Sequence, residues 1–268
     1  MNILVAIDEL DPSCHHHLEI ATQLARAYGG GLIAFHAAAP ADLAHAGRTL
    51  QQLAGGVSSE VAAYGEAGRA MAILEAADRH GCDLVVIGTQ GLDPFVGRFL
   101  DSPAHMVLAA GRHAVLVVHP EHGLRKRGPR TVLAAMADPD FSTRVLQHGL
   151  HLAKALNAQL KVVHVGSREE DPVAVLLHPR EPHSSQRMVA EAAAELTRAG
   201  VPSEGLVVPN YAGLADELAQ AADRLDADVI VIGSSGKLDL AQWMLGSIAE
   251  AVLHRSRRPV LVVPNLTL

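Results

Sequence analysis

The stretch Asp83-Leu-Val-Val-Ile-Gly88 decides the fold, because it returns 145 positions later as Asp228-Val-Ile-Val-Ile-Gly233. The same offset relates Val115-Leu-Val-Val118 to Val260-Leu-Val-Val263. Similarity at a fixed offset over much of a chain is the signature of an internal repeat. The sequence therefore predicts two copies of one structural unit.

The start of each copy is offset by less, because Ile3–Ala6 matches Val132–Ala135 at 129 positions. An insertion at Gly166–Met188 in the second copy accounts for the difference. We predict domains at 1–122 and 130–268, since the stretch between them is rich in Gly, Pro and basic residues, as linkers are.

Each copy alternates short apolar segments with Ala- and Leu-rich helical segments. Strands that are apolar throughout and separated by helices indicate an α/β fold with an open parallel sheet covered on both faces. Ser13 and Ser142 are plausible N-caps of the first helix in each copy. The expected strands are Asn2–Ile7, Leu32–His36, Glu60–Tyr64, a fourth ending at Gly88, Ala114–Val118, Thr131–Met136, Leu160–His164, Leu206–Val208, a fourth ending at Gly233, and Pro259–Val263.

The composition excludes several classes of protein. With 49% hydrophobic and 19% charged residues, the chain is not predicted to be disordered. Only 3% of residues are aromatic, which disfavours base stacking, so we expect no nucleic-acid partner. Two cysteines make no disulfide framework, and no apolar run approaches the roughly 20 residues of a membrane span. The first residues do not read as a signal peptide, so a cytoplasmic protein is expected.

The segment after the fourth strand of the second copy predicts an anion site. It reads Gly233-Ser-Ser-Gly236, then nine residues, then Gly246-Ser247-Ile248 at the start of a helix. In open parallel sheets, ligands bind beyond the carboxyl ends of the strands. Glycines let the backbone approach a ligand, and free N–H groups at a helix start attract anions. Lys237 and three arginines, Arg255, Arg257 and Arg258, are close by in sequence.

These motifs resemble the universal stress protein family, specifically its tandem members. The resemblance rests on Val5-Ala-Ile-Asp8, on Asp83-Leu-Val-Val-Ile-Gly-Thr-Gln-Gly91 and on Arg258-Pro-Val-Leu-Val-Val-Pro264. It implies two five-stranded parallel sheets of order 3-2-1-4-5. It also implies an ATP site with Mg²⁺ at Gly233, Gly236, Gly246 and Ser247. Family members often pair through strand five, so the resemblance implies an intramolecular pseudo-dimer.

The first copy departs from this pattern at its phosphate loop. Asp8, Gly88, Gly91 and Ser102 are present, but Asp101 stands where the second copy has Gly246. Two unit charges about 4 Å apart repel by roughly 4 kcal/mol at an effective dielectric near 20, about a thousandfold in affinity. Residues 1–122 carry 6 Lys and Arg against 13 Asp and Glu, whereas 123–268 carry 16 of each. We therefore predict a degenerate first site.

The second copy departs at the end of its first strand. Ala137 stands opposite Asp8, the aspartate that in the family lies near the adenosine and the metal. Asp138 would replace it only if the loop shifts. Adenosine or Mg²⁺ affinity should fall while phosphate binding remains, so we predict one nucleotide site, in the second domain.

Histidines form two further patterns. Cys14-His15-His16-His17 resembles a metal cluster, but adjacent helical residues point in different directions, so at most two of them could share an ion. A surface role is favoured, and zinc held by Cys14, one histidine and Asp8 or Asp11 is the alternative. His36 and His164 end matching strands, which indicates a shared role, in packing or else in contact with a ligand at this edge.

The sequence thus favours a nucleotide-binding sensor or regulator in the stress response rather than an enzyme. No catalytic base can be named for the alternative of a slow ATP hydrolase. A third possibility is an interaction protein that binds no nucleotide. The protein partner is unknown, and the chain could also form a homodimer.

Overall fold

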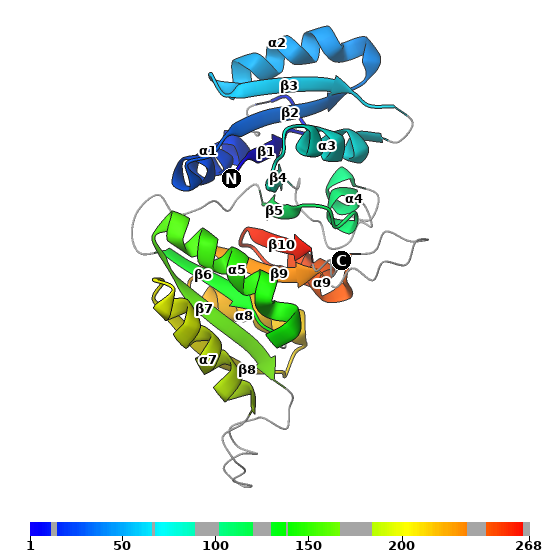
Figure 1. The fold of residues 1–268 in the computed structure, drawn as a ribbon. Helices are drawn as coiled ribbons and strands as arrows, with labels where there is room; N and C mark the ends of the chain where they lie inside the picture. The colour runs from blue at the N-terminus through cyan, green and yellow to red at the C-terminus, as the bar shows by residue number, and fades with distance from the viewer. Residues whose placement is uncertain are drawn as a thin grey trace. The chain divides into compact units, whose positions relative to one another are not determined.

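The computed structural model describes residues 1–11, 15–65, 68–88, 102–119, 130–137, 139–166, 184–234 and 245–264. These residues cluster into two compact units. One unit contains the described residues up to 119, and the other contains residues 130–234 and 246–264. Both units have helices packed against a parallel sheet (Figure 1).

In the first unit, each paired strand runs parallel to its neighbour, in the order β3-β2-β1-β4-β5. Helix α1 packs on β1, β2 and β4, whereas α3 packs beside α4. Right-handed crossovers place α1 and α2 on one face and α3 and α4 on the other. The elements are β1 (Ile3–Ala6), α1 (His15–Tyr28), β2 (Leu32–Ala38), η2 (Pro40–Asp42), α2 (Leu43–Ala54), β3 (Ser58–Ala63), α3 (Gly68–Arg79), β4 (Leu84–Gly88), α4 (Pro103–Ala109) and β5 (Ala114–Val118).

The second unit repeats this arrangement in the order β8-β7-β6-β9-β10, again parallel. In Figure 1, α5 lies in front of its sheet and α8 behind it. The elements are β6 (Arg130–Ala135), α5 (Pro139–Leu156), β7 (Ala158–Gly166), α7 (Ser184–Arg198), β8 (Ser203–Pro209), α8 (Leu214–Arg224), β9 (Val229–Ser234), α9 (Ser247–Arg255) and β10 (Val260–Pro264).

The predicted α/β class and the strand order 3-2-1-4-5 are confirmed in each unit. The third strand of the second unit is longer than predicted, because β8 pairs with β7 from Ser203 to Pro209. Polar residues such as Glu204 belong to this edge strand, whose outer side faces solvent. Pairing of the two units as a pseudo-dimer stays a prediction.

Aliphatic side chains build both cores. Ile3, Leu4 and Val5 of β1 are fully buried. In the second unit, Leu133 of β6 and Ile230 of β9 lie side by side and are also fully buried. Each fully buried aliphatic side chain contributes about 1.5–3 kcal/mol. The small share of aromatic residues is therefore no obstacle to a stable fold.

The aspartate that opens the repeated motif has a structural role at the amino end of each sheet. Asp83 Oδ2 accepts a hydrogen bond from Asn2 N at 2.8 Å. Asp228 Oδ2 accepts one from Thr131 N, also at 2.8 Å. Each carboxylate thus ties the start of the fourth strand of its unit to the start of the first.

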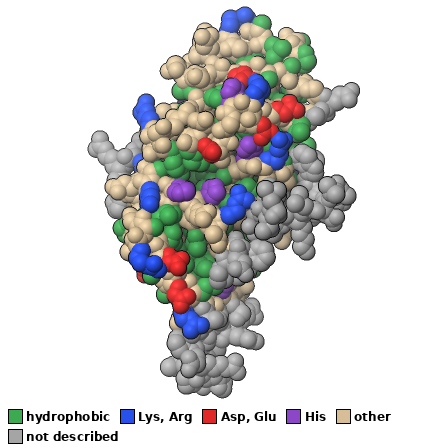
Figure 2. Space-filling view, in the orientation of Figure 1, with side chains coloured by type: hydrophobic (Ala, Val, Ile, Leu, Met, Phe, Trp, Pro, Cys, Tyr) green, Lys and Arg blue, Asp and Glu red, His purple; other side chains and the backbone are tan. Residues whose placement is uncertain are grey.

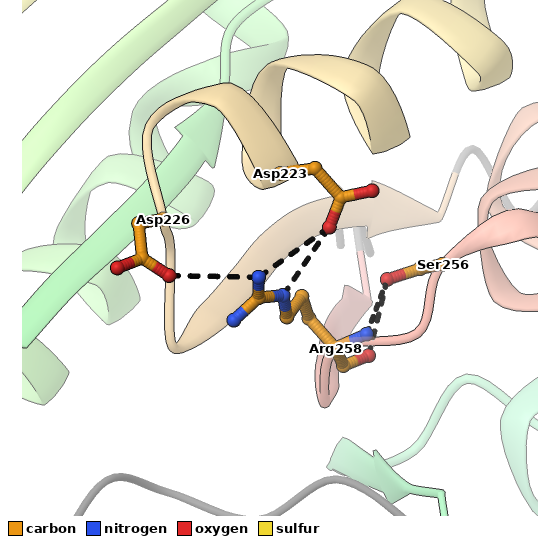
Figure 3. A network of polar contacts seen from close by, with 4 residues as sticks. All are labelled: Asp223, Asp226, Ser256 and Arg258. Carbon is orange, nitrogen blue, oxygen red and sulfur yellow. Dashed lines mark hydrogen bonds and ion pairs between the residues drawn. The ribbon is translucent and has the colours of Figure 1, made fainter.

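A second repeated contact joins the end of a helix to the residue that precedes the last strand. In Figure 3, the Arg258 guanidinium lies 3.4 Å from Asp223 Oδ1 and 3.6 Å from Asp226 Oδ1, while its backbone N–H donates to Ser256 Oγ. In the first unit, His113 Nε2 lies 2.9 Å from Asp78 Oδ1 in the corresponding position.

Candidate functional site

The carboxyl edge of the second sheet gathers five residues of the predicted nucleotide site. Strand β6 pairs with β9, so Ala137, which follows β6, and Gly233 in β9 lie at the ends of adjacent strands. Helix α9 contacts β9 and begins at Ser247, directly after Gly246. Ala137, Gly233, Ser247 and Ile248 are exposed, Ile248 by 48%. This edge is therefore open to a ligand.

The first turn of α9 presents backbone donors. Gly246 is the N-cap and has no side chain to bind them. The first intrahelical bond runs from Glu250 N to the Gly246 carbonyl at 3.0 Å. The N–H groups of Ser247, Ile248 and Ala249 precede that bond, so the helix leaves them for another acceptor. Together with the helix dipole, they favour an anion at this point.

The corresponding helix of the first unit, α4, has an N-cap side chain that binds one of its backbone N–H groups. Ser102 is the N-cap of α4, and its Oγ accepts a hydrogen bond from His105 N at 3.1 Å. Pro103 follows and has no N–H to offer. Fewer donors remain at this helix start than at α9, which agrees with a degenerate first site.

The glycines that end β4 and β9 serve packing on their Cβ side. A Cβ on Gly88 would lie 1.9 Å from the His17 ring, and one on Gly233 would lie 3.2 Å from a Val145 methyl group. The space that each glycine leaves is therefore filled by the helix that follows the first strand. The prediction that the backbone of Gly233 approaches a ligand concerns its other side and stays a prediction.

The end of the first strand differs between the units. Asp8 Oδ1 accepts a hydrogen bond from Arg69 Nη1 at 2.9 Å, and the Arg69 guanidinium also lies 5.4 Å from the centre of the Tyr64 ring. In the second unit, Ala137 takes the place of Asp8, and Leu214, the first residue of α8 and 40% exposed, takes that of Arg69. These two positions thus hold charged side chains in the first unit and apolar side chains in the second.

Ser142 holds the end of the first strand in the second unit. Its Oγ accepts a hydrogen bond from Ala137 N at 3.0 Å, and its side chain is almost fully buried. Helix α5 begins three residues earlier, at Pro139. The prediction that Ser142 is an N-cap is therefore wrong, because the hydroxyl binds the strand end instead of the first turn.

His36 and His164 play one role in both units. His36 Nδ1 donates to the Ile7 carbonyl at 2.8 Å, and His164 Nδ1 donates to the Met136 carbonyl at 2.9 Å. Each ring braces the carbonyl where the first strand ends. The prediction that the two histidines share one role agrees with these matching hydrogen bonds, whereas the choice between packing and ligand contact stays a prediction.

Two of the nearby arginines are bound elsewhere. Arg255 Nε donates to Asp216 Oδ1 at 2.6 Å, which joins α9 to the first turn of α8. Arg258 is bound at the amino end of the sheet, as described above. The sequence left open whether these cations face the anion site, and in the structure both are paired with carboxylates instead.

Glu217 organises the loop before α8. Its Oε1 accepts hydrogen bonds from Tyr211 N at 3.2 Å and Ala212 N at 3.1 Å, and the residue is buried. Sequence analysis missed this carboxylate, as it missed Arg69, Leu214 and the contact of His17 with Gly88.

Several predicted residues lie outside the described part of the chain: Asp138 and Gly236 of the second site, Gly91 and Asp101 of the first, Lys237, Cys14, and most of the insertion. Their roles stay predictions.

Helix α1 begins with the three adjacent histidines of the predicted cluster, His15, His16 and His17. Among the described residues, no group of three or more His, Cys, Asp or Glu side chains is placed to hold a metal ion. His16 and His17 meet edge to face with 6.3 Å between ring centres. Burial, with a smaller effect of His16, lowers the pKa of His17 to about 4.

On the face shown in Figure 2, acidic and basic side chains are interspersed rather than gathered by sign. Within the described ranges, the helices are too short or too polar for any of them to cross a bilayer.

Fold and site define a tandem of two open parallel α/β units, in which a glycine lies at or next to the end of the fourth strand. The model of the universal stress protein family matches residues 41–119 and 129–264, well over half of the chain. The chain therefore belongs to the universal stress protein family.

Individual relatives match one half or the whole of the chain. A universal stress protein of Mycolicibacterium smegmatis is 30% identical over 132 residues, which cover 49% of this chain and 95% of that protein. A solved universal stress protein of Archaeoglobus fulgidus DSM 4304 covers 99% of this chain and 98% of its own, with a TM-score of 0.69 at 16% identity. A third match, a universal stress protein solved in complex with cAMP, covers 52% of this chain at 26% identity and a TM-score of 0.40.

Proposed function

We propose that the second unit binds an adenine nucleotide, with its phosphates at the start of α9. The observation that carries this proposal is the first turn of α9, where Gly246 contributes no capping side chain and the next two residues are exposed. A phosphate there would accept the backbone hydrogen bonds that the helix itself does not use.

The nucleoside would lie toward Ala137 and the end of β6. Since Ala137 has no carboxylate, any Mg²⁺ would be held through the phosphates. Asp216 is paired with Arg255, and Glu217 accepts two backbone hydrogen bonds, so these two carboxylates are already in use. The chain would act as a cytoplasmic sensor or regulator whose nucleotide state a protein partner reads.

Calorimetric titration of nucleotide-free protein with ATP, with and without Mg²⁺, tests this function. ADP and cAMP complete the series. We expect one site per chain, and we expect Gly246→Asp to weaken binding by roughly a thousandfold, since it sets a carboxylate against the phosphates. Ser102→Ala is the matched control, because it alters the equivalent helix of the first unit and should leave the affinity unchanged.

Other outcomes point to the alternatives. No binding at millimolar ATP would reject the nucleotide site and favour an interaction protein. Two sites per chain would show that the first unit is functional. Turnover of ATP that is lost in Gly246→Asp would identify a slow hydrolase.

A further inference from the structure

The His17 ring occupies the space beside the end of β4 that a side chain on residue 88 would need. A Cβ on Gly88 would lie 1.9 Å from Cε1 and 2.2 Å from Nε2 of the ring. Helix α1 also packs on β1 and β2. The ring is therefore a direct contact between the first turn of α1 and the carboxyl edge of the first sheet.

The side chain that makes this contact is polar, although filling the space beside Gly88 requires no polar group. Nε2 of His17 and Nε2 of His16 are both buried, and neither has a hydrogen-bond partner among the described residues. A buried polar atom without a partner is destabilising, because it has given up its hydrogen bonds to water. In the second unit, Val145 makes the corresponding contact with Gly233 and carries no such cost.

Where the structure describes the chain around the ring, the neighbouring groups do not favour a positive charge on it. On α1 its ionisable neighbour is His16, which would repel a proton. At the end of β1, Asp8 is bound to Arg69, and at the end of β2, His36 is bound to the Ile7 carbonyl. Strand β4, Leu84–Gly88, has no ionisable side chain.

We propose that His17 is an acid-responsive latch of the first unit: a proton on the ring releases it from Gly88 and frees the first turn of α1 from the end of β4. The released ring would be hydrated and able to stabilise its charge, which the packed ring cannot do. The second unit has no counterpart of this latch, because Val145 does not titrate.

The direction of the pH dependence follows from the two states of the ring. The packed ring has a pKa of about 4, and a released ring would regain the ordinary value of 6.5. The released state then binds the proton more tightly, so the packed state loses stability as pH falls from 6.5 to 4. A difference of 2.5 pKa units corresponds to at most roughly 300-fold in the opening equilibrium.

Two measurements on the full chain test the latch. The first follows the His17 ring by NMR during a pH titration. The second compares amide-exchange protection factors at pH 7 and pH 4 for Ile87 and Gly88, with Ile232 and Gly233 as internal controls. We expect titration near pH 4 and roughly a hundredfold loss of protection at the end of β4, but little loss at the end of β9.

His17→Val copies the second unit and should remove most of that acid-induced loss, whereas His16→Gln should keep it. Titration of His17 near 6.5, or an equal loss of protection in His17→Val, would overturn the proposal. If His17→Val does not fold, the titration of the wild-type ring still decides.

Discussion

Arg69 Nη1 lies 2.9 Å from Asp8 Oδ1 and joins the first turn of α3 to the end of β1. The guanidinium therefore stands beside the carboxylate that the family resemblance associates with adenosine and metal. Both partners differ in the second unit, where Ala137 and Leu214 take their places. The two edges therefore differ at both of these positions, charged in the first unit and apolar in the second.

The Asp8–Arg69 pair should stabilise the protein only weakly. Both side chains are about half exposed, and exposed ion pairs contribute roughly 0.2–1 kcal/mol. We expect a coupling of that size from urea unfolding of Asp8→Ala, Arg69→Leu and the double variant. The pair Arg187 and Glu191, on the exposed face of α7, is the control and should give a similar or smaller coupling. A coupling above about 2 kcal/mol would contradict the assignment.

Alanine in place of the two strand-end glycines should have unequal effects. Gly88→Ala collides with the His17 ring, and overpacking of this kind costs about 1–3 kcal/mol. Gly233→Ala meets only a methyl group at 3.2 Å and should cost clearly less. Denaturant unfolding measures both. Adding His17→Ala should restore most of the stability lost in Gly88→Ala but none of that lost in Gly233→Ala; equal losses would disprove the close contact.

Glu60 should make the stability of the first unit depend on pH below about 4.5, the ordinary pKa of a glutamate. Burial alone would raise the pKa of this carboxyl, but hydrogen bonds and positive charge from His80 and Arg79 lower it overall. A lowered carboxyl pKa stabilises the fold above the unfolded value of about 4.5, and that stability is lost as pH falls through the folded pKa. Glu60→Gln should reduce the difference in stability between pH 6 and pH 3. An unchanged pH profile would count against this network.

The two helix starts should respond differently to loss of a hydroxyl. Ser102→Ala removes the cap of α4 and should cost about 1 kcal/mol in thermal unfolding. Ser247→Ala removes no cap, so its unfolding should be unchanged, while nucleotide affinity should fall by up to about tenfold. Reversed effects would mean that the first unit holds the anion site.

Much of the fold could be predicted because it depends on a local pattern. Short apolar stretches such as Leu84–Gly88, separated by helical segments, are typical of central parallel strands, and their return at a fixed offset predicts the second unit. The ends of β8 could not be predicted, because Ser203 and Glu204 join the sheet by pairing with β7 rather than by burial.

The candidate site was predictable only in outline. Parallel topology alone places Ala137, Gly233 and Gly246 at one edge. The contacts of His17 with Gly88 and of Arg69 with Asp8 join residues that are at least 61 positions apart in the sequence. Each contact depends on the direction of a helix over the sheet and on the rotamer of one side chain. Neither leaves a signal in a single sequence.

Each repeated motif runs across its sheet from the amino edge to the carboxyl edge. Its aspartate, Asp83 or Asp228, makes a hydrogen bond at the amino edge. The aspartate binds the start of the first strand, and the glycine lies at the carboxyl edge, after four apolar residues. Both copies keep the aspartate and the glycine, whereas the end of the first strand beside that glycine differs, with Asp8 in one copy and Ala137 in the other. A duplicated unit built in this way can acquire a different ligand without endangering its own folding.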